Sequence, residues 1–316
     1  MSLKAILQSE GRRLAVLCGG ESTEREVSLV SGKAVADAFT ALGIPCDLFA
    51  IESNELPASL KAEEHIVLPV IHGTYGEDGV LSAELDRKGY LYGGSGMAAS
   101  AICFDKLVSK AMAERLGIPV ADELLLVPPC ELGYGEISQS LGDAFILKPR
   151  RDGSSVGLHL VRCEADFKAA VPDMQNAEYL AEAYLDGIDL TVGVLDGNPM
   201  GVVAVRPKGG LYDYDHKYTS GMSEYEFPAK VEDVVTRQLQ DWAKLIHDTC
   251  GCRDIARVDF RMSNTGSLIF LEINTLPGMT PTSLLPKSAQ CEGLSFDDVI
   301  CRWAEAALNR SRGTAK

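Results

Sequence analysis

The sequence predicts an α/β protein that begins with a parallel-sheet domain and continues into smaller α+β units. Up to Gly93, strand-like apolar runs alternate with helical patterns, which is the βαβ arrangement of a parallel sheet. After Gly117 the predicted strands become shorter and lie closer together. The chain has 316 residues, more than one compact core usually serves, so roughly two to three domains are expected.

The first domain is expected to alternate four strands with two helices. A helix should follow Gly19-Gly20, because Thr23 and Glu26 have the spacing of a capping box. Its apolar residues recur at helical intervals up to Gly43, a suitable C-terminal cap. Residues 1–12 carry no pattern that assigns them a role. The predicted strands are 13–18, 46–51, 66–72 and 90–93, and the second helix is 79–88.

The rest of the chain divides into two further regions, which gives predicted domains at 1–95, 96–181 and 182–316. The second region opens with one continuous helical pattern and continues with four strands and one helix. Its predicted elements are a helix at 97–116, strands at 123–127, 144–149, 157–162 and 179–183, and a helix at 164–171.

The third region contains an aperiodic stretch rich in Gly, Tyr and Asp at about 208–224. A loop of this length inside a compact domain is usually functional. The turn signals Asp196-Gly197 and Asn264-Thr265-Gly266 each separate two strands. The predicted elements are strands at 189–195, 200–205, 255–262 and 267–274, and helices at 231–250 and 296–309.

The composition narrows the function classes. The net charge of −15 argues against a nucleic-acid-binding or anionic-membrane surface, since both need clustered cations. Nine cysteines without a CxxC pair are typical of free thiols in a reducing compartment. The sequence shows neither an apolar leader nor a run of about 18 apolar residues. A cytoplasmic protein is expected.

Two segments resemble catalytic or nucleotide-binding motifs but lack the neighbouring residues or elements that those motifs require. Residues 153–157 match GxSxG, but a nucleophile elbow requires a helix after its serine, and 157–162 alternates like a strand. Gly19-Gly20 follows the first strand, yet neither GxGxxG nor GxxxxGK[ST] is present. The sequence therefore does not favour a serine hydrolase, a nicotinamide enzyme or a P-loop enzyme.

The predicted hairpin at 255–274 carries candidate metal ligands. Asp259 lies on its first strand, and Glu272 and Asn274 lie two apart on the second, so they share a face. Such hard oxygen donors suit magnesium bound together with phosphate oxygens. Carboxylates among apolar strand residues need a reason to be buried. The alternative is that these acids face solvent on an edge hairpin.

Lys148 ends an apolar strand and precedes the segment 150–157, which is rich in glycine and serine. Small residues, backbone amides and hydroxyls are suited to covering a phosphate. Lys148 could then be a phosphate ligand. It could equally be a surface lysine whose aliphatic stem lies along the strand.

Five segments, in this order, resemble D-alanine–D-alanine ligases of the ATP-grasp superfamily, and the resemblance runs from about Arg13 to the C-terminal helix. The segments are GGESTEREVS at 19–28, HG at 72–73 with GEDG at 76–79, KP at 148–149 with GSSVG at 153–157, YDYDHKY at 212–218, and EINTLPGMT at 272–280.

The resemblance implies a three-domain ATP-grasp fold that binds ATP between the central and C-terminal domains. Lys106 and Lys148 would contact the phosphates and the adenine side. Asp189 stands where the family commonly has a glutamate for the ribose hydroxyls. Glu182, Tyr184 and Leu185 would bind the adenine. Asp259, Glu272 and Asn274 would hold two Mg²⁺ or Mn²⁺ ions.

The resemblance also implies sites for two D-alanines. Glu24 would bind the ammonium group of the first D-alanine, and would otherwise be an acid that stabilises a helix N-terminus. Ser28 and His72 would lie beside it, although an isolated histidine is more often structural. Ser154 and Tyr218 would link with Glu24 to close the flap and the 208–224 lid. Arg257 and Gly278 would stabilise the oxyanion. Lys217 would contact ATP, and Lys217, Ser283 and Leu284 would position the second D-alanine.

The implied reaction joins two D-alanines through an acyl phosphate, for peptidoglycan precursors, in a homodimer. A D-alanine–D-lactate ligase is one alternative, but Tyr218 favours an amine nucleophile over a hydroxyl. Another ATP-grasp amino-acid ligase is a second alternative. A nucleotide-binding regulator without catalysis is a third, and the set of Asp259, Glu272, Asn274 and Arg257 argues against it.

Overall fold

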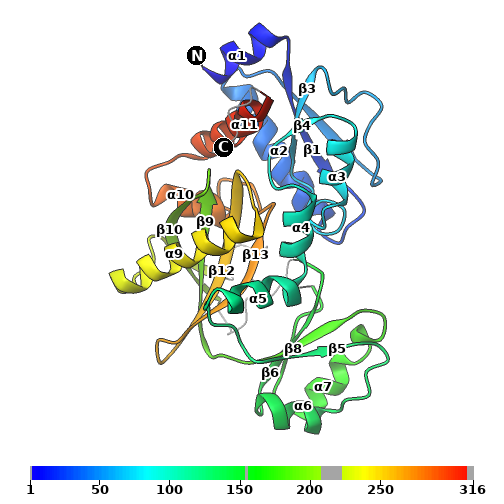
Figure 1. Ribbon diagram of the computed structural model, residues 1–316, viewed down its shortest axis with the longest axis vertical. Coiled ribbons are helices and arrows are strands. Elements are labelled where there is room, and N and C mark those ends of the chain that lie inside the picture. The colour runs from blue at the N-terminus through cyan, green and yellow to red at the C-terminus, as the bar shows by residue number, and fades with distance from the viewer. Residues whose placement is uncertain (1, 154–155, 208–222, 312–316) are drawn as a thin grey trace.

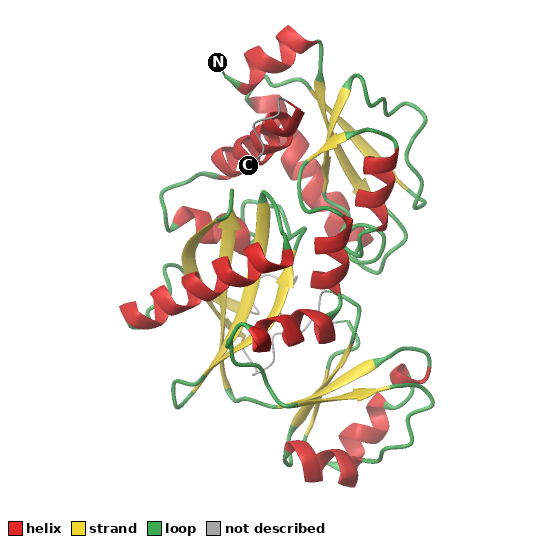
Figure 2. Cartoon of the chain, viewed as in Figure 1, coloured by secondary structure: helices red, strands yellow, loops and turns green. Residues whose placement is uncertain are grey.

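The described part of the chain forms three sheets that lie one after another along the long axis of the molecule (Figures 1 and 2). The computed structural model describes residues 2–153, 156–207 and 223–311. The order in space differs from the order in sequence, because the last sheet of the chain lies between the other two (Figure 1).

The N-terminal sheet is parallel, with strand order β2-β1-β3-β4, which confirms the predicted βαβ domain. Its strands are nearly continuous apolar runs because both faces are covered. One face packs against α2, α1 and the C-terminal helix α11, and the other packs against α3. The elements are α1 (Leu3–Glu10), β1 (Arg13–Gly19), α2 (Arg25–Ala41), β2 (Cys46–Ile51), β3 (His65–Pro69), α3 (Val80–Arg87), β4 (Leu91–Tyr92) and α11 (Phe296–Ser311).

Two N-terminal expectations need correction. The segment 2–12, to which no sequence pattern assigned a role, has a structural one, because Leu3 and Leu7 of α1 are buried in the core shared with α11. The predicted Thr23–Glu26 capping box is wrong, because α2 begins at Arg25 and Glu24 is its N-cap residue, without a side-chain capping bond. The Glu24 carboxylate instead lies against Gly73 and Gly153.

The helical pattern from 97 to 116 is two helices rather than one. The residue between them, Asp105, has extended backbone angles and caps the second helix by accepting a hydrogen bond from Val108 N at 3.3 Å. Both helices pack with α9 on the C-terminal sheet, although the predicted boundary at 95/96 groups them with the central domain. These helices are α4 (Met97–Phe104) and α5 (Lys106–Arg115).

The central sheet is antiparallel, with strand order β5-β8-β6-β7, and has its own small core. Helix α6 was not expected from the sequence, because its polar pattern with one buried residue, Ile137, is weak. The elements are β5 (Glu123–Leu126), α6 (Tyr134–Leu141), β6 (Phe145–Pro149), β7 (His159–Val161), α7 (Glu164–Ala170), a 3-10 turn (Asp173–Gln175) and β8 (Tyr179–Ala183).

The C-terminal sheet is antiparallel, with strand order β11-β10-β9-β12-β13. Most of the predicted lid, 208–222, lies outside the described residues. Its predicted end at 224 is too late, because β11 pairs with β10 from Ser223. The elements are β9 (Gly187–Leu195), β10 (Asn198–Pro207), β11 (Ser223–Glu226), α9 (Asp233–Cys250), β12 (Ile255–Ser263), β13 (Leu268–Asn274) and α10 (Leu284–Gln290).

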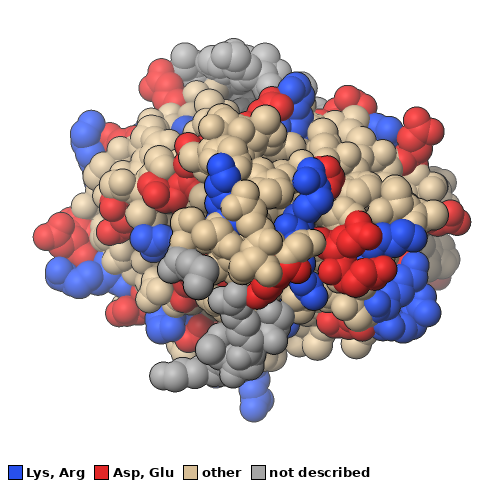
Figure 3. Space-filling model, turned by 90° about the horizontal axis from the view of Figure 1, so that it is seen from above, with Lys and Arg blue, Asp and Glu red and all other residues tan. Residues whose placement is uncertain are grey.

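The cysteines, the apolar helices and the surface charges can be compared with what the composition led us to expect. All nine cysteines are free thiols, as expected. Within the described ranges, no helix combines the length and the apolar character needed to cross a bilayer. On the face drawn in Figure 3, basic and acidic side chains are interspersed, without one continuous basic area.

Candidate active site

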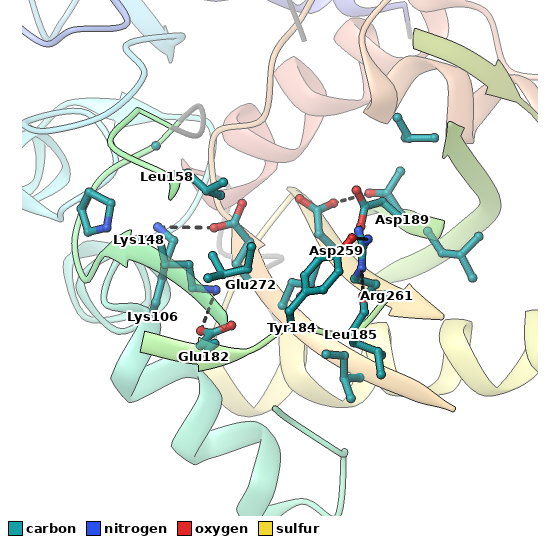
Figure 4. Close-up of a pocket in the computed structure, with 18 of the residues that line it drawn as sticks. Lys106, Lys148, Leu158, Glu182, Tyr184, Leu185, Asp189, Asp259, Arg261 and Glu272 are labelled. Atoms are coloured by element: carbon teal, nitrogen blue, oxygen red, sulfur yellow. Dashed lines mark hydrogen bonds and ion pairs between the residues drawn. The ribbon is translucent and has the colours of Figure 1, made fainter. Parts of the chain in front are cut away.

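A pocket lies where the central sheet faces the C-terminal sheet, and it holds most of the predicted nucleotide-binding residues (Figure 4). Its empty space is about 1070 Å³, including solvent at its open side. A pocket of this size accommodates a ligand as large as a nucleotide. Lys106, Lys148 and Glu182 lie on one side of the pocket, Asp259, Arg261 and Asp189 lie on the other, and Glu272 lies between them (Figure 4).

The β12–β13 hairpin presents its polar residues to this pocket because its strands alternate. Val258 and Phe260 are buried in the core beneath α9, whereas Asp259 points to the opposite face. A β-bulge between β12 and β13 leaves Leu271 without a direct partner. Leu271 and Glu272 can therefore both line the pocket, and Glu272 stands directly opposite Asp259.

The predicted metal ligands meet at this point. Asn274 Nδ2 donates to Asp259 Oδ2 at 3.2 Å, Thr191 Oγ1 donates to Asp259 Oδ1 at 2.5 Å, and Arg257 donates to both carboxylate oxygens at 2.8–3.1 Å. In the described residues, no group of three or more His, Cys, Asp or Glu side chains is suited to hold a metal. Asp259, Glu272 and Asn274 carry side-chain oxygens of the kind that magnesium takes together with phosphate and water oxygens.

Buried lysines face this hairpin from the other side of the pocket. Lys106 Nζ lies 3.4 Å from Glu272 Oε2 and donates to Asp152 O in the flap. Lys148 Nζ lies 2.7 Å from Glu182 Oε1. Burial opposes ionisation of Glu182, but Lys148 and Lys110 outweigh that effect and lower the pKa of its carboxyl group. The surface-lysine alternative for Lys148 is therefore wrong, because Lys148 is buried and lines the pocket.

Arg261, which was not predicted from the sequence, organises the segment between β8 and β9. Its guanidinium donates to Leu185 O at 2.5 Å and to Asp189 Oδ1 at 2.6 Å, and stacks over the Tyr184 ring at 5.4 Å. Arg261 thus contacts three of the four residues predicted for the adenine and the ribose, namely Leu185, Asp189 and Tyr184. Strand alternation from Arg257 and Asp259 was the available signal for Arg261.

Glu24 approaches the site from the N-terminal domain. A Cβ atom on Gly153 would lie 2.2 Å from Glu24 Oε2, and one on Gly73 would lie 3.0 Å from the same oxygen. The flap can therefore approach the buried Glu24 carboxylate only because residue 153 is glycine. Ser154, which is predicted to bridge to Glu24, follows directly and lies outside the described residues, as do Lys217 and Tyr218.

Glu77 is a buried acid to which the sequence analysis gave no role. Its Oε2 accepts a hydrogen bond from Gly73 N at 2.7 Å. Burial, and then the nearby Glu24 carboxylate, raise the pKa of Glu77 to about 8. It lines a small recess together with Asp152, Glu272 and Asn274. The only signal in the sequence was its position within GEDG at 76–79.

His72 and Ser28 are buried and bonded to the protein itself. His72 Nδ1 lies 2.9 Å from Leu276 O, and burial lowers the pKa of His72 to about 4. The neutral ring therefore donates from Nδ1 to that carbonyl. The Ser28 hydroxyl accepts from Gly19 N at 2.8 Å and donates to Val70 O at 2.6 Å. Both side chains thus fix the loops near Glu24, and their contact with substrate stays a prediction.

Three of the residues predicted for the oxyanion and the second D-alanine, Gly278, Ser283 and Leu284, follow β13, whereas Arg257 lies on β12 and Lys217 lies outside the described residues. Ser283 is the N-cap residue of α10, and its Oγ lies 2.8 Å from Thr280 Oγ1 and accepts from Thr280 N at 3.1 Å. A Cβ atom on Gly278 would lie 3.2 Å from Ser283 Oγ. Leu284 lines the nucleotide pocket. The end of this segment therefore reaches the pocket that Asp259 and Glu272 also line.

Comparisons with known proteins identify relatives of this chain. The profile of the family described as "D-ala D-ala ligase C-terminus" matches residues 112–304. A D-alanine–D-alanine ligase from Anaeromyxobacter sp. (strain K) is 39% identical over 302 residues, which is 94% of this chain and 97% of that protein.

Two solved structures have a similar fold. A D-alanine–D-alanine ligase from Bacillus anthracis, complexed with ATP, superposes with a TM-score of 0.82 at 24% identity, over 96% of this chain and 100% of that one. The VanG D-Ala:D-Ser ligase from Enterococcus faecalis gives a TM-score of 0.80 at 26% identity, over 94% and 99%. The predicted ATP-grasp fold is confirmed, and because both the family profile and the full-length relative match, the chain belongs to the D-alanine–D-alanine ligase family.

Proposed function

We propose that this protein is an ATP-dependent ligase that joins two D-alanines into D-alanyl-D-alanine for peptidoglycan precursors. One observation carries the nucleotide part: buried Lys106 and Lys148 face Asp259 and Glu272 across a single pocket. The choice of D-alanine rests on the 39% identity to a D-alanine–D-alanine ligase over 94% of the chain.

ATP is proposed to lie in the pocket with its adenine near Glu182 and its phosphates near Lys106. The Glu182 carboxylate would accept a hydrogen bond from the adenine amino group, and backbone groups of Tyr184 and Leu185 would complete the contact. Asp189 would accept from the ribose. Its bond to Arg261 supports this role, because the arginine fixes where its carboxylate points.

Two magnesium ions, or manganese ions, are proposed to bind at Asp259, Glu272 and Asn274. When bound, they would neutralise phosphate charge during phosphoryl transfer. Arg257 would keep the Asp259 carboxylate in position, and Thr191 would orient one of its oxygens.

The reaction is proposed to run in two steps. A carboxylate oxygen of the first D-alanine takes the γ-phosphoryl group, which leaves ADP and an acyl phosphate. The free amine of the second D-alanine then attacks the acyl carbon and loses a proton, and inorganic phosphate departs from the tetrahedral intermediate. The chain's residues contribute positioning and charge stabilisation and exclude water, so no side-chain nucleophile is needed.

The two D-alanines are proposed to be held by residues from several segments of the chain. Glu24 would bind the ammonium group of the first D-alanine, with Ser28 and His72 shaping that end. Arg257 and Gly278 N would stabilise the oxyanion. Lys217, Ser283 and Leu284 would hold the second D-alanine, and Ser154 and Tyr218 would close the flap and lid over it.

The quaternary structure and location are proposals as well. We expect a homodimer that forms through the N-terminal domain, in the cytoplasm. Light scattering of the purified protein measures the mass in solution, and a monomer at micromolar concentration would refute the dimer.

Phosphate release from ATP tests the central proposal. The purified protein is incubated with ATP and magnesium, and with D-alanine, L-alanine, D-serine or D-lactate, singly and in pairs. D-Alanine alone should suffice for release and should yield D-alanyl-D-alanine. Release that requires D-lactate or D-serine beside D-alanine would instead identify a depsipeptide or mixed-dipeptide ligase. Release independent of every amino acid would refute the ligase assignment.

A further inference from the structure

Lys110 is a fully buried cation whose charge is matched by two acids. It lies on α5 one helical turn after Lys106, so both lysines point toward the central sheet. Lys110 is 1% exposed and is not among the residues that line the pocket. Its Nζ lies 2.8 Å from Glu182 Oε1 and 2.5 Å from Glu123 Oε2. Lys110 therefore lies behind Glu182, and can affect a ligand only through that carboxylate.

The two acids bound by Lys110 stand directly opposite each other. Glu123 of β5 pairs with Glu182 of β8 in the antiparallel ladder. Like charges in directly opposed positions destabilise a sheet. Lys110 offsets this repulsion from the helix side, and Lys148 binds Glu182 from the pocket side.

The two lysines share one acceptor. Lys148 Nζ and Lys110 Nζ both approach Oε1 of Glu182, at 2.7 and 2.8 Å. Lys148 lines the nucleotide pocket, whereas Lys110 does not. If Lys148 turns toward a bound nucleotide, Glu182 keeps a countercharge only because Lys110 remains.

We propose that Lys110 is a positioning residue that keeps Glu182 ionised when Lys148 moves to the nucleotide, and so fixes the preference for a 6-amino purine. The inference rests on the proposed ATP site. An ionised carboxylate only accepts hydrogen bonds, which suits the adenine amino group. Without Lys110, the buried Glu182 would take up a proton rather than remain an unpaired buried charge. A protonated carboxyl group donates, which suits the 6-oxo group of a hypoxanthine nucleotide.

Lys110→Met tests the proposal, because it keeps the length of the side chain and removes the charge. Binding of ATP and of ITP is measured by calorimetry with magnesium and without D-alanine. Kd for ATP should rise at least tenfold, and the ATP-to-ITP preference should fall by about tenfold, which corresponds to roughly 1.4 kcal/mol. Lys110→Arg should restore most of the preference. A parallel turnover assay should show the change in KM for ATP rather than in kcat.

Two control variants separate this role from a structural one. Glu123→Gln removes the other acid bound by Lys110 and should leave the ATP-to-ITP preference within about threefold of wild type. Lys168→Met breaks an exposed lysine–glutamate pair in the same sheet domain, 2.7 Å long, and should change nothing. An unchanged preference in folded Lys110→Met, or an equal loss in Glu123→Gln, would overturn the proposal.

A double variant keeps the test decisive if Lys110→Met alone does not fold. Lys110→Met/Glu123→Gln also removes the charge of the half-buried Glu123 and leaves Glu182 with Lys148. It should show the same loss of ATP-to-ITP preference, whereas a wild-type preference would overturn the proposal. The binding assay contains no amino acid, so it remains informative even if the wild-type protein fails to ligate D-alanine.

Discussion

At the scale of single residues, Glu272 contacts both sides of the nucleotide pocket. It stands opposite Asp259 in the β12–β13 ladder, and its Oε2 lies 3.4 Å from Lys106 Nζ of α5. The neighbouring bulge turns it into the pocket together with Leu271. One carboxylate therefore lies within reach of both the proposed metal and the proposed phosphates.

Glu272→Gln should remove most activity and leave the fold intact. The amide keeps the size of the side chain, but it supplies a weaker metal ligand and no charge to pair with Lys106. We expect kcat/KM to fall by roughly a hundredfold or more, as metal-site changes commonly cause. Titration of phosphate release with magnesium provides the measurement, with the exposed Glu114→Gln on α5 as control. Near-normal turnover at low magnesium would refute the metal assignment.

His72 should make the folded state sensitive to acid. The unfolded chain protonates this histidine below about pH 6.5, whereas burial lowers the pKa of the folded ring to about 4. The unfolded state therefore binds more protons in this window, so His72 contributes stability above pH 6.5 that is lost as pH falls toward 4.

His72→Gln removes that titration and keeps a donor for Leu276 O. Between pH 7 and pH 5, wild type should lose about 2 kcal/mol more of its unfolding free energy than the variant. Urea denaturation at both pH values measures the difference. Parallel losses in the two proteins would show that His72 is not the group responsible.

The hairpin acids could be predicted from the sequence, but several charged residues around them could not. Strand alternation and a turn signal were enough to place Glu272 and Asn274 on one face. Lys110, Arg261 and Glu77 were missed because a buried charge within an apolar or helical pattern looks like a surface residue until its partner is known. Those partners lie on other elements, such as β8 for Lys110.

At the element scale, the flap between β6 and β7 depends on one glycine. Gly153 approaches the Glu24 carboxylate so closely that any Cβ atom would overlap with it. Upstream, Asp105 fixes the start of the flap by accepting hydrogen bonds from Arg150 at 2.7 and 2.8 Å and from Arg151 at 2.8 Å. The start of the flap is thus tied to the α4–α5 junction, and Gly153 meets the N-terminal domain.

Gly153→Ala should displace the flap from Glu24. Because shifts of about 1 Å in a site can cost a hundredfold in rate, we expect kcat/KM for D-alanine to fall by roughly that factor. Gly135→Ala, in helix α6 of the same domain, is the matched control. It has open space around the new methyl group and should gain about 0.5–1 kcal/mol of stability with unchanged activity. Equal activity in both variants would contradict the close approach.

Helices and strands could be predicted from the sequence where their own hydrophobic pattern was strong. Strand β2 and strand β8 lie at the predicted residues. The helices α1, α6 and α10 were missed because they are short and gain their stability from packing. Helix α10 also contains Pro286, which is tolerated only because it lies in the first turn. The break at Asp105 was hidden within a continuous periodic pattern.

On the scale of the whole molecule, the C-terminal helix joins two domains. Arg310 of α11 donates to both oxygens of Asp254 at 2.6 and 2.9 Å, and also to Tyr92 O at the end of the N-terminal sheet. Asp254 lies just before β12 and also accepts from Gly94 N at 2.6 Å. No local pattern in the sequence indicated that the last helix packs on the first sheet.

Arg310→Met should destabilise the protein by roughly 2–4 kcal/mol, because it leaves the buried Asp254 carboxylate without its cation. Arg302→Met, at an exposed position on the same helix, should stay within about 0.5 kcal/mol of wild type. Thermal unfolding of the three proteins measures both effects. A wild-type melting temperature for Arg310→Met would show that the pair contributes no net stability.

The packing of α11 on the first sheet also has a consequence for biosynthesis. The core beneath that sheet includes Val299, Trp303 and Ala307 from the last helix of the chain. A ribosome therefore exposes β1 and β3 long before it makes the helix that covers them. The domain that is translated first can close only after α11 has been made, so the nascent chain carries an incompletely covered apolar face until then. Chaperone binding to stalled chains should persist until α11 has left the exit tunnel.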